Sequence, residues 1–302
     1  MRRAGAATPR GVVERWAAAR TYRHSRYPAA RIAAERGSAT ISVCLPAREC
    51  AATVVPIVDA LLALRDAGAI DEVVVVDAAS PDGTAEVARR AGATVHQEAE
   101  LLPEQGPVLG KGDAMWRALS VLDGELLCFL DADTADFSAH FCTGLLGPLV
   151  CESGVQLVKA FYRRPFEHGG VALEDGGGRV NHLMARPALS LFYPELAGVR
   201  QPLAGEVAAR RSLLERLPFA TGYAVEIAML IDAWREVGLE SIAQVDLDVH
   251  RNRHQPLQAL TPMAQAVLAA VARRLQRDKR LGELPGVDAV ERPPFVNLST
   301  AR

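Results

Sequence analysis

The chain has 302 residues, of which 49% are hydrophobic and 23% are charged, the balance of a globular protein with a substantial core. Lys and Arg total 34 against 36 Asp and Glu, which gives a net charge of -2. The chain thus lacks the excess of basic residues that is typical of proteins that bind nucleic acids or membrane surfaces. No apolar run approaches the ~18 residues of a membrane span, no signal peptide is recognisable, and the five cysteines form no CxxC pair, so we expect a cytoplasmic protein with reduced thiols.

The N-terminal residues 1–39 are rich in Ala and Arg and contain Pro9 and Pro28 as helix breakers. They are expected to form a solvated arm or short helices. The core then begins with a strand over 40–46. A helix follows over 52–64, because its apolar residues recur at helical spacing.

Strands and helices then alternate. They are expected over 72–77 (strand), 84–90 (helix), 94–96 (strand), 113–122 (helix) and 125–130 (strand). Alternation at these lengths predicts an α/β fold with a doubly wound, mostly parallel sheet.

Beyond residue 135 the alternation is less regular. Elements are expected over 155–162 (strand), 180–192 (helix), 225–237 (helix), 242–249 (strand) and 262–276 (helix). A glycine-dense loop precedes the first of these helices, and the tail from about residue 280 looks irregular because it contains several prolines.

The strand over 125–130 runs directly into two carboxylates, Asp131 and Asp133. Ligands of open α/β sheets bind at the carboxyl ends of the strands. Carboxylate oxygens suit Mg²⁺ or Mn²⁺, and such ions usually also bind substrate phosphates. The pattern therefore indicates a metal that bridges a nucleoside diphosphate, although Asp-x-Asp sequences also occur in turns and helix caps.

Two further positions have both a ligand-binding and a plain structural interpretation. Asp77 ends a strand, where it either accepts hydrogen bonds from a nucleotide or caps the turn at Ser80. Lys111 lies between Gly110 and Gly112, where the backbone can approach a phosphate and the ammonium group supplies charge. The alternative for Lys111 is a solvated lysine.

The motifs of the first half occur in a set order: Leu45-Pro46-Ala47, Asp77 to Thr84, Gly110-Lys111-Gly112 and Asp131-Ala132-Asp133. In this order they resemble the nucleotide-sugar-binding half of GT-A-fold glycosyltransferases. The second half continues with Phe161-Tyr162-Arg163-Arg164-Pro165, Gly176-Gly177-Gly178-Arg179, Gln201-Pro202-Leu203, Gly222-Tyr223-Ala224-Val225-Glu226 and His250-Arg251-Asn252-Arg253. The whole set is similar to the glucosyl-3-phosphoglycerate synthase family, which belongs to glycosyltransferase family 81 and also includes mannosyl-3-phosphoglycerate synthases.

The resemblance implies transfer of glucose or mannose from a nucleoside diphosphate hexose to the 2-hydroxyl of 3-phosphoglycerate, with retention and with Mg²⁺ or Mn²⁺. It also implies a homodimer. The corresponding division of the chain is an N-terminal arm (1–39), a nucleotide-sugar-binding half (40–135), an acceptor-binding half (136–260), and a C-terminal helix and tail (261–302).

Site residues follow from the same resemblance. The nucleotide sugar is expected at Pro46, Ala47, Glu49, Asp77, Ser80, Lys111, Asp131, Ala132, Tyr223 and Glu226, and the acceptor at Gly178, Arg179, Asn181, Asn252 and Arg253. Asp133, Lys111 and Glu226 are the expected catalytic residues. Asp133 is expected to bind the metal together with His250, while Asn252 or His254 takes that place if the register differs.

Two positions depart from the family pattern. Arg48-Glu49-Cys50 stands where the family has an Asn-Glu-Glu type sequence, so Glu49 either takes the acidic role one position early or the contact is lost. Asn181 stands where threonine is common, a polar replacement that we expect to be tolerated.

Three other functions compete with this interpretation. An inverting family 2 glycosyltransferase typically carries a Gln-x-x-Arg-Trp motif and membrane-associating segments, which the sequence lacks. A nucleotidyltransferase would need a glycine-rich first-strand signature, where Leu45-Pro46-Ala47-Arg48 stands instead. A catalytically silent sugar-nucleotide-binding protein fits the altered Arg48-Glu49-Cys50 segment. The identity of the hexose and of the nucleotide base stays open.

Overall fold

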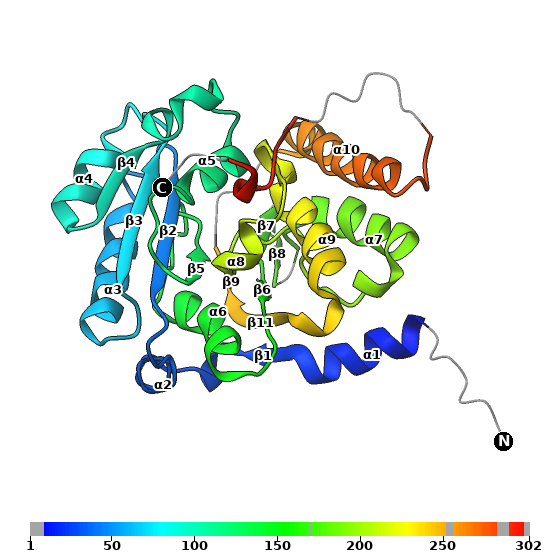
Figure 1. The fold of residues 1–302 in the computed structure, drawn as a ribbon, viewed down its shortest axis with the longest axis horizontal. Helices are drawn as coiled ribbons and strands as arrows, with labels where there is room; N and C mark the ends of the chain where they lie inside the picture. The colour runs from blue at the N-terminus through cyan, green and yellow to red at the C-terminus, as the bar shows by residue number, and fades with distance from the viewer. Residues whose placement is uncertain (1–8, 169–170, 175, 252–255, 283–289, 299–302) are drawn as a thin grey trace.

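The computed structural model describes residues 9–168, 171–174, 176–251, 256–282 and 290–298. Its centre is an eight-stranded sheet with the order β1-β11-β6-β9-β5-β2-β3-β4 (Figure 1). The strands of this sheet are β1 (Thr21–Arg23), β2 (Ile41–Ala47), β3 (Glu72–Asp77), β4 (Thr94–Gln97), β5 (Leu126–Phe129), β6 (Leu157–Arg163), β9 (Val207–Arg210) and β11 (Ile242–Val249).

Within this described sheet, every neighbouring pair is parallel except the two that β9 makes with β5 and β6. The predicted mostly parallel sheet is confirmed. Helices cover both of its faces, as a doubly wound fold requires. These helices are α1 (Pro9–Arg20), α2 (Ala29–Glu35), α3 (Val54–Asp66), α4 (Thr84–Ala91), α5 (Lys111–Ala118), α6 (His140–Cys151), α7 (Arg186–Phe192), α8 (Arg211–Leu214), α9 (Val225–Val237) and α10 (Thr261–Arg277).

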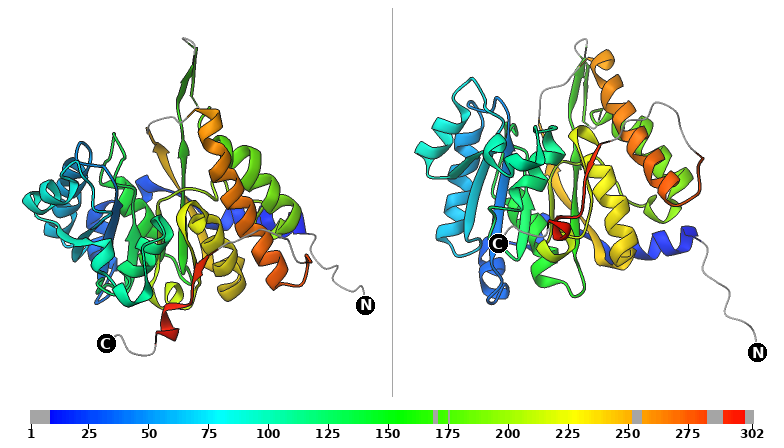
Figure 2. Two further views of the ribbon diagram at one scale, coloured as in Figure 1. Left: turned by 90° about the horizontal axis from the view of Figure 1, so that it is seen from above. Right: turned by 45° about the horizontal axis from the view of Figure 1, so that its top comes forward.

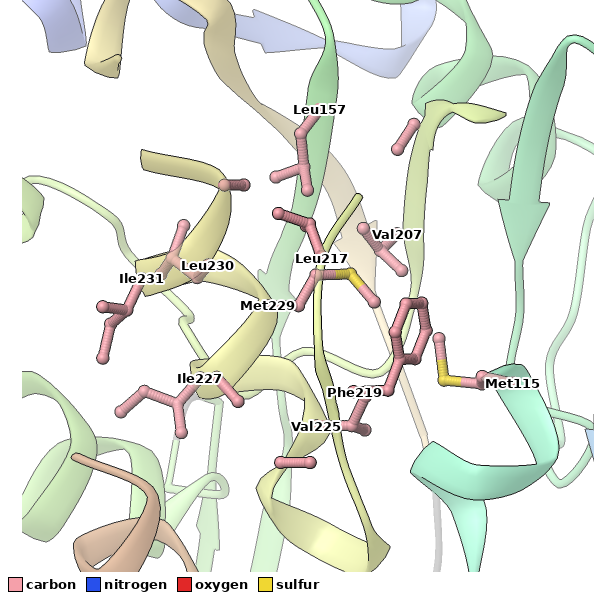
Figure 3. Packing of buried hydrophobic residues seen from close by; sticks show 14 of the residues in the cluster. Met115, Leu157, Val207, Leu217, Phe219, Val225, Ile227, Met229, Leu230 and Ile231 are labelled. Atoms are coloured by element: carbon pink, nitrogen blue, oxygen red, sulfur yellow. The ribbon is translucent and has the colours of Figure 1, made fainter. Parts of the chain in front are cut away.

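The two faces form two hydrophobic cores. Along β3 the valines alternate between them: Val74 and Val76 contribute to one core, and Val73 and Val75 to the other. The first core holds residues of α5, α7, α9 and α10, and Figure 3 shows part of it around Phe219. The second holds residues of α2, α3 and α6. A strand buried on both faces needs a continuous apolar sequence, which explains the valine run.

The N-terminal segment is not a solvated arm. It forms short helices, which was the other expectation, and Trp16, Tyr27 and Ile32 are fully buried. The Trp16 indole Nε1–H donates a hydrogen bond to the Ile242 carbonyl over 2.8 Å, and β1 pairs in parallel with β11. The segment therefore supplies the edge strand of the central sheet.

Several further elements were not predicted from the sequence. Helix α6 contains Gly144, Gly147 and Pro148, residue types that ordinarily disfavour a helix interior; a side chain at Gly147 would overlap the Tyr27 ring. Strand β9 is only four residues long. The hairpin of β7 (Phe166–His168) and β8 (Val171–Leu173) stands out from the body in Figure 2.

The C-terminal tail is also more regular than expected. Strand β12 (Glu291–Arg292) pairs antiparallel with β10 (Phe219–Ala220), and the Trp116 indole donates a hydrogen bond to the Pro293 carbonyl. In the part of the chain that the structure describes, no helix is both long enough and apolar enough to span a membrane.

Candidate active site

A cleft of about 480 Å³ opens at the carboxyl ends of β2 and β5. It continues between the loop that follows the β7–β8 hairpin and the start of α10. Eleven of the sequence-predicted site residues line it: Pro46, Ala47, Lys111, Asp131, Ala132, Asp133, Gly178, Arg179, Asn181, Tyr223 and Glu226. The predicted donor, catalytic and acceptor residues therefore meet in one cavity.

Lys111 occupies the centre of the charged part of this cleft. Its Nζ lies 2.5 Å from Asp131 Oδ1 and 3.1 Å from Glu226 Oε1. Burial alone would lower the pKa of Lys111, but the two carboxylates raise it above its ordinary value. Lys111 therefore stays a cation, and the interpretation as a plain solvated lysine is wrong.

The first turn of α5 fixes Lys111 in place. Asp113, which is fully buried, accepts hydrogen bonds from the Leu109 N–H (2.8 Å) and from Arg292 Nε (2.6 Å). Arg117 donates to carbonyls of the preceding loop, including that of Leu102 at 2.9 Å. The C-terminal strand thus holds the helix start that carries Lys111.

Gly205 lies directly against the Lys111–Asp131 pair. A Cβ at this position would lie 2.6 Å from Lys111 Nζ and would overlap both Asp131 carboxylate oxygens. Only glycine lets the backbone approach the pair this closely.

We expect Gly205→Ala to separate Lys111 from Asp131 and to lower kcat/KM roughly tenfold or more, since one charge-assisted hydrogen bond contributes roughly 1.5–3 kcal/mol. Steady-state kinetics measure the loss. Gly282→Ala is the matched control, because a Cβ there meets nothing within 4 Å. Unchanged kinetics in Gly205→Ala would show that the pair tolerates displacement.

Asp133 presents an exposed carboxylate at the same end of the cleft. Burial of part of the group and the neighbouring Asp131 raise its pKa, against the opposing effect of Lys111 and His250. A divalent cation at Asp133 would relieve this repulsion. The described residues contain no group of three acidic, His or Cys side chains able to hold a metal. The site therefore fits an ion with few protein ligands, as Mg²⁺ and Mn²⁺ bound to a substrate diphosphate would be.

His250 is fully buried behind the cleft. Its Nε2 lies 2.9 Å from Glu206 Oε1 and 3.2 Å from Thr134 Oγ1. Its Nδ1 has no hydrogen-bond partner among the described residues, which suits a nitrogen that binds a ligand. Burial alone would lower the pKa of His250, but Glu206 raises it. The other candidates, Asn252, Arg253 and His254, lie outside the described residues.

Another part of the cleft lining is basic and rich in glycine. Gly178 has a φ of +68°, and Arg179 follows it before the turn of π-helix at Asn181–Ala185. Asn181 Oδ1 accepts a hydrogen bond from the Leu203 N–H at 3.3 Å. Arg164, to which the sequence assigned no role, also lines this end. It lies against Gly177, whose N–H donates to the Arg164 carbonyl.

The remaining predicted donor residues lie beside the cleft. The Asp77 carboxylate accepts hydrogen bonds through Oδ2 from the Ser80 N–H and Gln97 Nε2, while Oδ1 has no partner within the described chain. Asp77 therefore caps the turn and still keeps one acceptor for a ligand. Ser80 Oγ accepts from the Glu49 N–H at 2.9 Å, which anchors the atypical segment of the chain.

The sequence of this chain is similar to those of known proteins. Residues 42–148 match the model of the family "Glycosyl transferase family 2". The glucosyl-3-phosphoglycerate synthase of Mycolicibacterium smegmatis is 42% identical over 298 residues, which cover 94% of this chain and 98% of the relative.

Solved structures agree. The mannosyl-3-phosphoglycerate synthase of Rubrobacter xylanophilus superposes with a TM-score of 0.89 at 44% identity, covering 94% of this chain and 99% of that one. The glucosyl-3-phosphoglycerate synthase of Mycobacterium tuberculosis, in complex with Mn²⁺, UDP-glucose and phosphoglyceric acid, superposes with a TM-score of 0.79 at 39% identity, covering 90% and 95%. The chain therefore belongs to the glucosyl-3-phosphoglycerate synthase family of glycosyltransferases.

Proposed function

We propose that this protein transfers glucose or mannose from a nucleoside diphosphate hexose to the 2-hydroxyl of 3-phosphoglycerate, with retention and with a bound Mg²⁺ or Mn²⁺. The observation that carries the proposal is that one cleft brings together Asp133, the Lys111–Asp131–Glu226 cluster and the Gly178–Arg179 turn. A relative with this fold binds Mn²⁺, UDP-glucose and phosphoglyceric acid together. Both glucosyl and mannosyl enzymes are among the similar proteins, so the proposal includes both hexoses.

At the donor end the chain supplies charge of both signs. Asp133 and His250 would hold the divalent ion, which would stabilise the negative charge of the departing diphosphate. Lys111 adds a fixed cation at the same end, while Asp131 and Glu226 accept hydrogen bonds from ribose or hexose hydroxyls. Tyr223 is 58% exposed at the rim, where its ring can cover the hexose.

At the acceptor end Arg179 and the Gly178 turn would bind the phosphate or carboxylate of 3-phosphoglycerate. Binding there would place the 2-hydroxyl next to the anomeric carbon, on the face from which the diphosphate leaves. Holding both reactants in one orientation supplies much of the rate enhancement. No carboxylate of the described cleft needs to form a covalent bond with the sugar in this scheme.

Arg179→Ala should raise the KM for 3-phosphoglycerate by roughly 10- to 100-fold, because a hydrogen bond to a charged group contributes roughly 1.5–3 kcal/mol. The KM for the nucleotide sugar should stay within about twofold, since Lys111 and Asp131 lie at the other end. Initial rates with each substrate varied in turn give both constants. Arg186→Ala, an exposed arginine at the start of α7, is the control. Equal changes in the two KM values would contradict the assignment.

Assembly and location form part of the same proposal. We expect a homodimer, and Leu183 and Leu191 near α7 are 73% and 72% exposed, as residues of a contact surface would be in an isolated subunit. Size-exclusion chromatography with light scattering tests this. The cytoplasm is the proposed location because all five cysteines are free thiols.

An end-point assay with purified protein tests the proposed reaction. UDP-glucose, GDP-glucose and GDP-mannose are offered separately with Mg²⁺ and 3-phosphoglycerate. Release of nucleoside diphosphate should require both the metal and 3-phosphoglycerate. Donor binding by calorimetry without any turnover would contradict the acceptor, and it would favour the sugar-nucleotide-binding protein without activity.

A further inference from the structure

The antiparallel strand β9 brings a buried carboxylate to the site edge of the sheet. Because β9 runs against β5 and β6, its amino end lies beside their carboxyl ends. Glu206 immediately precedes β9 and is 1% exposed. It therefore stands between the Asp131–Asp133 turn and the end of β6.

The two oxygens of Glu206 contact different partners. Oε1 lies 2.9 Å from His250 Nε2. Oε2 accepts a hydrogen bond from the Tyr162 hydroxyl at 2.8 Å, and that hydroxyl in turn accepts one from Arg164 Nη2 at 2.8 Å. Arg164 lines the acceptor end beside Gly178.

The contacts continue to the turn at Asp131–Asp133. His250 Nε2 lies 3.2 Å from Thr134 Oγ1, which donates to the Asp131 carbonyl at 3.3 Å. The His250 ring also stacks on the Tyr162 ring, with centroids 4.5 Å apart. A carboxylate at Nε2 keeps the proton on that nitrogen, so Nδ1 retains its lone pair for a ligand.

We propose that Glu206 is a positioning residue that aligns both ends of the cleft, holding the His250 imidazole for the metal and, through Tyr162, the Arg164 guanidinium for the acceptor. The inference rests on the proposed function, because it needs a metal at one end and an anionic acceptor at the other. Glu206 is absent from the cleft lining: its Oε2 accepts the hydrogen bond from Tyr162, and its Oε1 is in ion-pair contact with His250.

Glu206→Gln tests both arms at once. Glutamine has one carbonyl oxygen and one NH₂ group. Its oxygen can accept a hydrogen bond from only one of the two donors, and its NH₂ group, itself a donor, then faces the other donor. The affinity for Mn²⁺ in the presence of saturating UDP, measured by the electron paramagnetic resonance signal of free Mn²⁺, should fall about 10- to 100-fold. The KM for 3-phosphoglycerate should rise.

Tyr162→Phe separates the two arms. It removes the hydroxyl between Glu206 and Arg164 but leaves the Glu206–His250 contact in place. The KM for 3-phosphoglycerate should rise roughly tenfold, because each hydrogen bond of this hydroxyl has a charged partner, while Mn²⁺ affinity stays within about twofold. Tyr193→Phe is the control, because Tyr193 is equally buried and its hydroxyl has no partner among the described residues.

Wild-type Mn²⁺ affinity and wild-type acceptor KM in Glu206→Gln would overturn the inference. Equal effects of Tyr162→Phe and Glu206→Gln on Mn²⁺ affinity would also overturn it, since the arms would not be separate. If Glu206→Gln does not fold, Glu206→Asp keeps the charge, is one methylene too short to reach both partners, and carries the same expectations.

His250→Ala separates failure of this inference from failure of the proposed function. Weaker Mn²⁺ binding in His250→Ala with unchanged binding in Glu206→Gln contradicts the positioning role alone. Unchanged Mn²⁺ binding in His250→Ala shows that His250 is not a ligand, and it contradicts both the proposed metal site and the inference built on it.

Discussion

Asp133→Asn should lower kcat/KM for hexosyl transfer about 100- to 1000-fold while leaving the protein at least as stable as the parent. The loss follows because asparagine removes the charge that is proposed to hold the divalent ion, and such electrostatic stabilisation supplies several kcal/mol in the transition state. Kinetics at saturating Mg²⁺ and thermal unfolding of the same samples measure the two effects.

The stability half of this prediction comes from the pKa of Asp133. Partial burial and Asp131 raise that pKa in the folded protein. Below the unfolded pKa the carboxyl group is protonated in both states, so it does not change the free energy of unfolding. Above that pH the penalty for ionising the group in the folded protein grows, and it is complete once the pH exceeds the folded pKa. Asp133→Asn should therefore show a slightly higher melting temperature than the parent at pH 7.5 and the same one near pH 3. The gain is small because Asp133 is exposed to solvent.

The outcome that would contradict this account is a variant with near-parental turnover, or one with a sharply lower melting temperature. Asp136→Asn is the matched control. Asp136 lies three residues further on, is exposed, and pairs with Arg251 rather than with the cleft. Its turnover should match the parent.

Lys111→Gln should reduce both donor binding and stability. Without the ammonium, Asp131 and Glu226 face each other across the vacated position, and the diphosphate loses a fixed cation. We expect kcat/KM to fall about 100- to 1000-fold. The free energy of unfolding should fall by roughly 1–3 kcal/mol, less than for a fully buried pair because the Lys111 side chain is 25% exposed.

A double variant separates the two effects. Adding Glu226→Gln to Lys111→Gln removes one of the unbalanced carboxylates, so part of the lost stability should return. Activity should not return, because the cation is still missing. Recovery of activity in the double variant would show that Lys111 serves only to neutralise Glu226.

The first half of the chain was predictable because its signals are local. The strands β2, β3 and β5 are mostly apolar, and residues with a proposed chemical role stand at or just after the carboxyl end of each. The carboxyl ends of parallel neighbours meet at one edge, so the sequence alone predicts that Asp131 and Asp133 lie at that edge.

The antiparallel centre of the sheet was not predictable in the same way. The four residues of β9 carry no clear alternation, and their direction is fixed by pairing with β5 and β6, which lie far away in sequence. Glu206 and Arg164 acquire their partners only through that pairing. No short sequence pattern marks either residue.

Close packing explains the other differences. Glycine ordinarily disfavours a helix interior, yet α6 needs Gly144 and Gly147 because side chains there would overlap His24 and Tyr27 of the N-terminal segment. The same contacts bury Tyr27. The arginine-rich composition of that segment indicates solvent exposure and therefore does not predict that the segment packs at the edge of the central sheet. Strand β12 forms by pairing with β10 about 70 residues earlier in the chain. The proline-rich sequence of the tail carries no local signal for this strand.

The most direct test of the proposed reaction is nuclear magnetic resonance of the product formed from each active donor with 3-phosphoglycerate. The account predicts one product, in which the anomeric proton has the α configuration of the donor and correlates with C2 of the glycerate. A β-linked product, a linkage to another atom, or free hexose alone would contradict it.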